Sequence, residues 1–174
     1  MITIDLKKDA LDIQKLLADG VKKYIAKHKS SSTAKKHPPV TRIDLVYSLG
    51  DSESTPWVHL NFDTKPGSEP DGDPTHPDFG KLQRKNWLSA VQAVCEDEKV
   101  SVTLLNGKAK KCGDEALAET IGKFLVDMLL EARTNGVFAE LPQADHCELG
   151  VEDPSTGEFG WPNYEDRGKK NLVS

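Results

Sequence analysis

The amino-acid sequence predicts an α+β protein in which an antiparallel sheet of about four to five strands packs against two or three helices. Two stretches, 5–28 and 115–133, repeat apolar residues every three or four positions, which is the period of an amphipathic helix. Two others, 40–49 and 57–63, alternate apolar and polar residues as half-buried strands do. The order of elements, α-β-β-loop-α-β-β-α, is typical of α+β domains.

Composition indicates one domain spanning 1–174. The chain has 174 residues, of which 37% are hydrophobic and 29% charged. These values differ from those of disordered chains and coiled coils, and no apolar run approaches the ~20 residues that cross a bilayer. The N-terminus lacks the apolar core of a signal peptide, and three widely spaced cysteines suggest no disulfide framework. We therefore expect a cytoplasmic protein without a membrane partner.

The first half of the predicted fold is a helix followed by two strands. Gly20 lowers the helix propensity of the second half of helix 5–28. A flexible basic loop at 29–39 ends in two prolines, which stop regular structure. In strand 57–63, Phe62 is expected to face inward, and His59, Asn61 and Asp63 outward.

The second half contains two helices and a hairpin. Residues 82–97 are predicted to be helical, with Cys95 on the buried side. Asn106-Gly107 predicts a type I′ hairpin between strands 100–105 and 108–111, because that turn needs positive φ at both central positions. Asp114 is expected to cap the helix at 115–133. Another short strand is expected near 146–151.

Two irregular segments carry the candidate binding residues. The acidic loop at 64–80 is rich in proline and glycine, and loops of this length are often functional or disordered. The C-terminal segment, 152–174, is expected to dock because its aromatic residues are of the kind that dominate interface hot spots. The candidates are Glu69, Asp71, Asp73, His76, Asp78, Phe159, Trp161 and Tyr164.

Catalytic and metal-binding patterns are weak. The acidic loop does not have the glycine and glutamate spacing of an EF-hand, and the chain lacks the Cys-x-x-Cys and His-Glu-x-x-His pairs of zinc sites. We predict no cofactor and no catalytic residue. The alternative is a small metal-dependent hydrolase that uses the His/Asp cluster at 59–78, with His59, Asp63 and His76 as ligands. Cys112 follows three lysines and is the best candidate for a reactive thiol, although a buried structural role is favoured.

Charge alternates in blocks along the chain. The net charge of −5 combines +6 over 1–42, −7 over 43–80, +4 over 81–112 and −8 over 113–174. Such blocks either solvate the surface or produce faces of one sign that steer a charged partner. The basic stretch in the first block has few interleaved aromatic residues, so nucleic-acid binding is not expected.

Several short sequences carry a resemblance to bacterial cytoplasmic proteins of unknown function. They are Asp71-Gly72, Thr75-His76-Pro77, Asn86-Trp87, Gly136-Val137-Phe138, Leu141-Pro142 and Gly160-Trp161-Pro162-Asn163-Tyr164-Glu165. In size, acidity and α+β plan the chain is similar to immunity proteins of bacterial polymorphic-toxin systems. The resemblance implies a non-enzymatic protein that binds and blocks a toxin through an acidic surface, and a basic toxin domain is the partner that such a surface fits. A homo-oligomer whose 64–80 loop mediates assembly is a further possibility.

Overall fold

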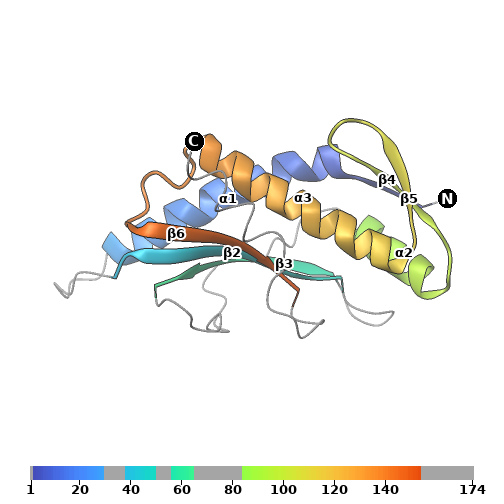
Figure 1. The fold of residues 1–174 in the computed structure, drawn as a ribbon, viewed down its shortest axis with the longest axis horizontal. Helices are drawn as coiled ribbons and strands as arrows, with labels where there is room; N and C mark the ends of the chain where they lie inside the picture. Colours follow the sequence, from blue (N-terminus) through green and yellow to red (C-terminus); the bar gives the residue numbers. More distant parts are fainter. Residues whose placement is uncertain (1, 30–37, 50–55, 65–83, 154–174) are drawn as a thin grey trace.

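The computed structural model describes residues 2–29, 38–49, 56–64 and 84–153. They form an α+β structure with three helices and two three-stranded sheets (Figure 1). The α+β class predicted from the sequence is therefore confirmed.

The helices are α1 (Leu6–Lys29), α2 (Arg84–Cys95) and α3 (Asp114–Thr134). Each lies within two residues of its predicted bounds. Gly113, which makes no side-chain cap hydrogen bond, is the N-cap of α3, so Asp114 is the first helical residue and not the cap. A carboxylate in the first helical turn still interacts favourably with the helix dipole.

The smaller sheet has the order β1-β4-β5, with β1 (Thr3–Asp5), β4 (Val100–Thr103) and β5 (Ala109–Cys112). β1 runs parallel to β4, and β4 and β5 form the predicted antiparallel hairpin. The turn is not type I′, because Gly107 has positive φ, at 81°, and Asn106 does not. The amide of Gly107 donates to Leu104 O at 2.8 Å, which closes a longer loop ending in a left-handed glycine.

The larger sheet has the order β3-β2-β6, with β2 (Val40–Ser48), β3 (Trp57–Asp63) and β6 (Gln143–Glu152). β2 and β3 pair antiparallel as predicted, whereas β6 pairs parallel to β2. The expectation of one antiparallel sheet was wrong: the described residues form two mixed sheets. A parallel neighbour requires a long crossover, and here the chain between β2 and β6 includes α2, the β4–β5 hairpin and α3.

The hydrophobic core lies between the larger sheet and the helices. Figure 1 shows α1 and α3 lying across one face of this sheet. On that face Tyr47 donates from its hydroxyl to the main-chain oxygen of Ala118 in α3, at 3.4 Å. The rings of Tyr24 and Phe62 pack with their centroids 4.8 Å apart. The apolar residues of β2 and β3 are therefore buried against helices.

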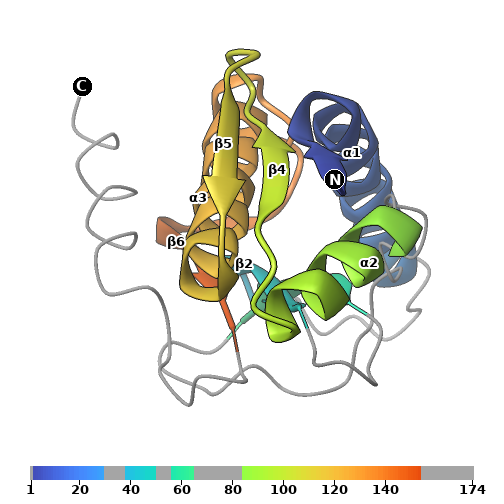
Figure 2. The ribbon, with the colours of Figure 1, turned by 90° about the vertical axis from the view of Figure 1, so that its right-hand side faces the viewer.

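The smaller sheet stands at one end of the molecule, beside α2 and the start of α1 (Figure 2). Trp87 of α2 is buried, and its indole N–H donates to Asp9 Oδ2 of α1 at 2.9 Å. In the part of the chain that the structure describes, no helix is both long and apolar enough to cross a membrane.

Candidate functional site

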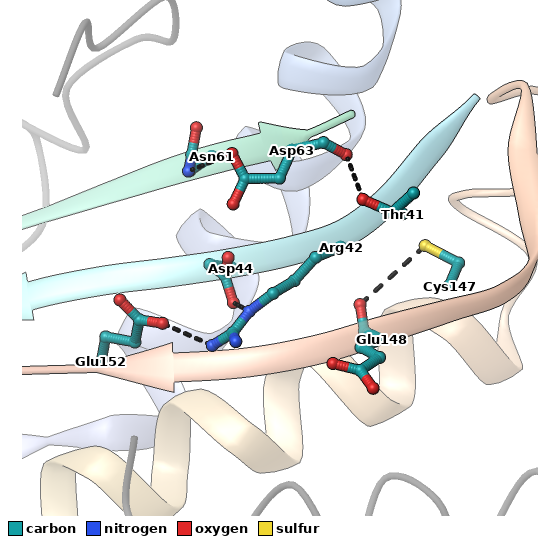
Figure 3. A network of polar contacts seen from close by, with 8 residues as sticks. All are labelled: Thr41, Arg42, Asp44, Asn61, Asp63, Cys147, Glu148 and Glu152. Atoms are coloured by element: carbon teal, nitrogen blue, oxygen red, sulfur yellow. Dashed lines mark hydrogen bonds and ion pairs between the residues drawn. The ribbon is translucent and has the colours of Figure 1, made fainter. Parts of the chain in front are cut away.

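The candidate site is the second face of the larger sheet, which points away from α1 and α3. Side chains alternate across a strand, so the residues between the core positions line this face. Asp44 on the central strand lies opposite Asn61 of β3 and Gly150 of β6, and Arg42 lies opposite Asp63 and Glu148. Figure 3 shows these polar residues gathered across the three strands.

Arg42 joins two carboxylates from different strands. Its Nε donates to Asp44 Oδ1 at 2.6 Å, and its Nη2 donates to Glu152 Oε1 (Figure 3). The Arg42 side chain is 24% exposed, whereas those of Asp44 and Glu152 are 0% and 6% exposed. Charge-assisted hydrogen bonds of this kind are among the stronger polar contacts in proteins. Arg42 therefore connects β2 to β6 beyond their backbone pairing.

The Asp44 carboxyl is the unusual member of this cluster. Among the described residues, its Oδ2 is buried and meets no hydrogen-bond partner. Burial raises the pKa of Asp44 to about 7; the Arg42 charge and hydrogen bond oppose this rise, and the charges of Glu152 and Asp63 add to it. A carboxyl that holds a proton near neutral pH, next to a guanidinium, is a feature that recurs at functional sites.

Gly150 makes the cluster sterically possible. A Cβ at this position would lie 2.2 Å from Asp44 Oδ1 and 2.6 Å from Arg42 Nη2. Real Cβ atoms do not approach other atoms so closely, so any larger residue at 150 would displace the ion pair. A glycine inside a strand often marks such a close approach.

The edges of the cluster are held by weaker contacts. The Thr41 hydroxyl donates to the main-chain oxygen of Asp63 at 3.2 Å, and Asn61 Nδ2 lies 3.5 Å from Asp63 Oδ1 (Figure 3). Farther along β3, the rings of Trp57 and His59 pack edge to face, with their centroids 4.7 Å apart. These residues make the face polar along most of its length.

The structure places two of the three candidate metal ligands. His59 and Asp63 share one face of β3, but four residues along a strand separate them by about 13 Å. Among the described residues, no group of three or more His, Cys, Asp or Glu side chains is arranged to hold a metal ion. His76 lies outside the described residues, as do all the other candidate binding residues: Glu69, Asp71, Asp73, Asp78, Phe159, Trp161 and Tyr164.

Of the three cysteines, Cys95 differs from expectation and Cys112 agrees with the favoured buried role. Cys95 is exposed rather than buried, because α2 ends at this residue. Cys112 is buried, with its Sγ 3.7 Å from Thr120 Oγ1, so it lacks the exposure of a reactive thiol. Cys147 is also buried, and this burial raises the pKa of its thiol.

Sequence reasoning missed Arg42, Asp44 and Glu152 as a unit. Two signals were available: Asp44 interrupts the apolar pair Ile43 and Leu45 in a predicted strand, and Gly150 interrupts Leu149 and Val151 in another. Neither signal shows that the two strands are neighbours, because their parallel pairing depends on the tertiary fold.

A second feature is a groove of about 280 Å³ between α3 and the β4–β5 hairpin, which lie side by side in Figure 2. Buried Leu6 and Phe124 contribute apolar surface, and Leu105, which is 36% exposed, lies beside them. Glu119 and Asp127 of α3 also line the groove. Its lysines are partly engaged: Lys123 pairs with Asp127 at 3.0 Å, and Lys110 donates to Thr120 Oγ1 at 2.9 Å.

Comparison with known proteins adds no relative: no protein-family model, curated protein or solved structure matches the chain significantly.

Proposed function

We propose that this protein is a non-enzymatic binding protein that engages a basic partner protein through the acidic outer face of α3. The observation that carries the proposal is a row of carboxylates at four-residue steps along this helix. Glu115, Glu119, Asp127 and Glu131 occupy four of five such positions, and Lys123 occupies the fifth. Residues four apart are neighbours on a helix surface, so these carboxylates form one stripe that is inclined to the helix axis.

The exposure and charge of the region support this role. Glu115, Glu119 and Glu131 are exposed, and the Asp127 side chain is 42% exposed. From α3 to the end of the described chain, residues 114–153 contain ten acidic and two basic residues. A face of one sign raises the rate at which an oppositely charged protein associates.

The groove beside the stripe supplies apolar surface for the same contact. Protein interfaces commonly place a buried apolar centre inside a polar rim. Here Leu105 and Phe124 would provide the centre, and Glu119 and Asp127 the rim. The acidic and aromatic candidates in 64–80 and 152–174 are, on sequence grounds, proposed to contribute to the same binding function.

The partner that best fits the resemblance noted above is a basic bacterial toxin domain, which this protein would neutralise in the cytoplasm by covering it. The alternative, a metal-dependent hydrolase, receives no specific support from the described residues. Elemental analysis of protein purified without chelator tests that alternative directly, because a stoichiometric bound metal would favour it.

The binding proposal is tested by capturing partners from a native-host lysate with two variants and the wild-type protein. The triple change Glu115→Lys, Glu119→Lys and Glu131→Lys reverses the stripe, and Glu96→Lys with Glu98→Lys reverses exposed charges elsewhere. We expect the wild type and the second variant to retain a basic protein that the first loses. Association of the purified pair should also slow by tenfold or more as salt rises from low to high, because screening weakens steering. Equal retention by both variants would contradict the proposal.

A further inference from the structure

Asp44 lies at the centre of the larger sheet, and its side chain is fully buried. The central strand β2 carries it, and β3 and β6 flank it on both sides. Its cross-strand neighbour Gly150 has no side chain, so the carboxyl and the Arg42 guanidinium occupy the space a Cβ would fill. The carboxyl is thus packed against the backbone of β6, out of contact with water.

The hydrogen bonds of this carboxyl are incomplete. Oδ1 accepts from Arg42 Nε, whereas Oδ2 is buried and has no partner among the described residues. A buried oxygen without a donor costs free energy, and the cost is far greater when the group is ionised. Burial and the unpartnered oxygen therefore favour the neutral form of Asp44, against the opposing hydrogen bond from Arg42.

The charges around Asp44 act in both directions: Arg42 lowers the pKa of Asp44, and the carboxylates of Glu152 and Asp63 raise it. One cation, Arg42, faces Asp44 from its own strand, and carboxylates face it from both neighbouring strands. The titratable and charged groups on this face of the described sheet are Arg42 on β2, His59 and Asp63 on β3, and Glu148 and Glu152 on β6; the Cys147 thiol of β6 points to the other face. Arg42 already binds Glu152, so an ionised Asp44 is a second buried carboxylate that competes for the same guanidinium.

We propose that Asp44 is a proton switch that controls how tightly β6 is held against β2. With the proton bound to its carboxyl, Asp44 is neutral, the Arg42 charge is balanced by Glu152, and the two strands pair firmly. When the proton leaves to water, the cluster gains a second negative charge, which shares the Arg42 guanidinium with Glu152 on the described part of this face, and the β2–β6 pairing weakens. The inference is independent of the binding function proposed above.

The sign of the pH effect follows from proton linkage. The pKa of Asp44 in the folded protein, about 7, lies above the ordinary value of 3.8, so the folded state holds a proton that the open state releases. The stability that the Asp44 proton gives to the folded state is fully present below the ordinary pKa and is lost as pH rises toward 7. Above that range both states are ionised, and the effect levels off. Linkage of one proton changes an opening equilibrium by at most about tenfold per pH unit.

Two measurements test the switch. The first is the carboxyl ¹³C shift of Asp44 in the wild-type protein as a function of pH. The second is amide hydrogen exchange in β6 from pH 5 to pH 8, corrected for intrinsic exchange rates, in the wild type, Asp44→Asn and the control Glu148→Gln. Asparagine has the shape of the neutral carboxyl and cannot ionise, whereas Glu148→Gln removes one charge from the same face and leaves Asp44 in place.

We expect Asp44 to titrate near neutrality and β6 protection in the wild type to fall by up to about tenfold per pH unit between pH 5 and pH 7. The fall should persist in Glu148→Gln and vanish in Asp44→Asn. Titration of Asp44 below pH 5, or the same pH dependence in Asp44→Asn, would overturn the proposal. If Asp44→Asn does not fold, the ¹³C titration of the wild-type protein decides by itself.

Discussion

Replacing Gly150 with alanine tests the steric basis of the polar cluster. The added Cβ would lie 2.2 Å from Asp44 Oδ1, whereas ordinary contacts begin near 3.4 Å, so the carboxyl or the strand must move by roughly 1 Å. Overpacking a well-filled site costs about 1–3 kcal/mol, and breaking a buried ion pair costs about 3–5 kcal/mol. Because the Arg42 side chain is partly exposed and can adjust, we expect the free energy of unfolding to fall by about 3 kcal/mol, between these two ranges.

Urea unfolding followed by circular dichroism at pH 7 measures this loss, and the slope of the transition should stay constant. The decisive comparison is the same substitution in an Asp44→Ala background, where the closest clashing atom is absent. There Gly150→Ala should cost at least 1.5 kcal/mol less, roughly the coupling seen between residues in direct contact. Gly113→Ala is the clash-free control, since a Cβ there meets no atom within 4 Å and its cost reflects only the N-cap position of Gly113. Equal costs in the two backgrounds, or a cost in the wild type no greater than that of the control, would refute the clash with Asp44.

Two further predictions concern buried groups elsewhere. Trp87→Phe removes the N–H that donates to the buried Asp9 carboxyl. Leaving a buried group without its partner costs about 1–3 kcal/mol, so urea unfolding should show a fall in the free energy of unfolding of about that size. An unchanged midpoint would mean that the bond contributes nothing. At pH 8 a thiol reagent should modify Cys95 rapidly in the native protein, whereas Cys112 and Cys147 should react only after unfolding because both are buried. A fast-reacting thiol that remains in Cys95→Ser would contradict this assignment.

Local patterning predicted most elements of the fold. The predicted bounds of the strand at 57–63 match those of β3. The predicted bounds of the helices at 5–28 and 115–133 differ from those of α1 and α3 by one residue at each end. These segments are long or strongly periodic, so the burial of one face alone specifies their structure. β1, with three residues, is too short to show any period.

The pairing of the strands could not be predicted in the same way. A parallel partner leaves no mark in the two strands themselves, and β6 pairs with β2 after a crossover containing two helices and a hairpin. The polar cluster depends on that pairing, because Arg42 meets Glu152 only when the two strands are neighbours. The sequence shows an acid between apolar residues, Asp44, and a glycine inside a strand, Gly150. It does not show that these two residues face each other in neighbouring strands.

The ion pair between Arg42 and Glu152 joins residues 110 positions apart in the chain. During synthesis, β2 and β3 emerge early and can form their hairpin, but the third strand of the sheet is complete only when residue 152 has left the ribosome. Until then one edge of β2 lacks its native partner strand, and unpaired strand edges favour association with other chains. Closing this long loop also raises the contact order, which slows folding. The larger sheet is therefore the last part of the described chain that can be finished, and its assembly is the step most exposed to aggregation.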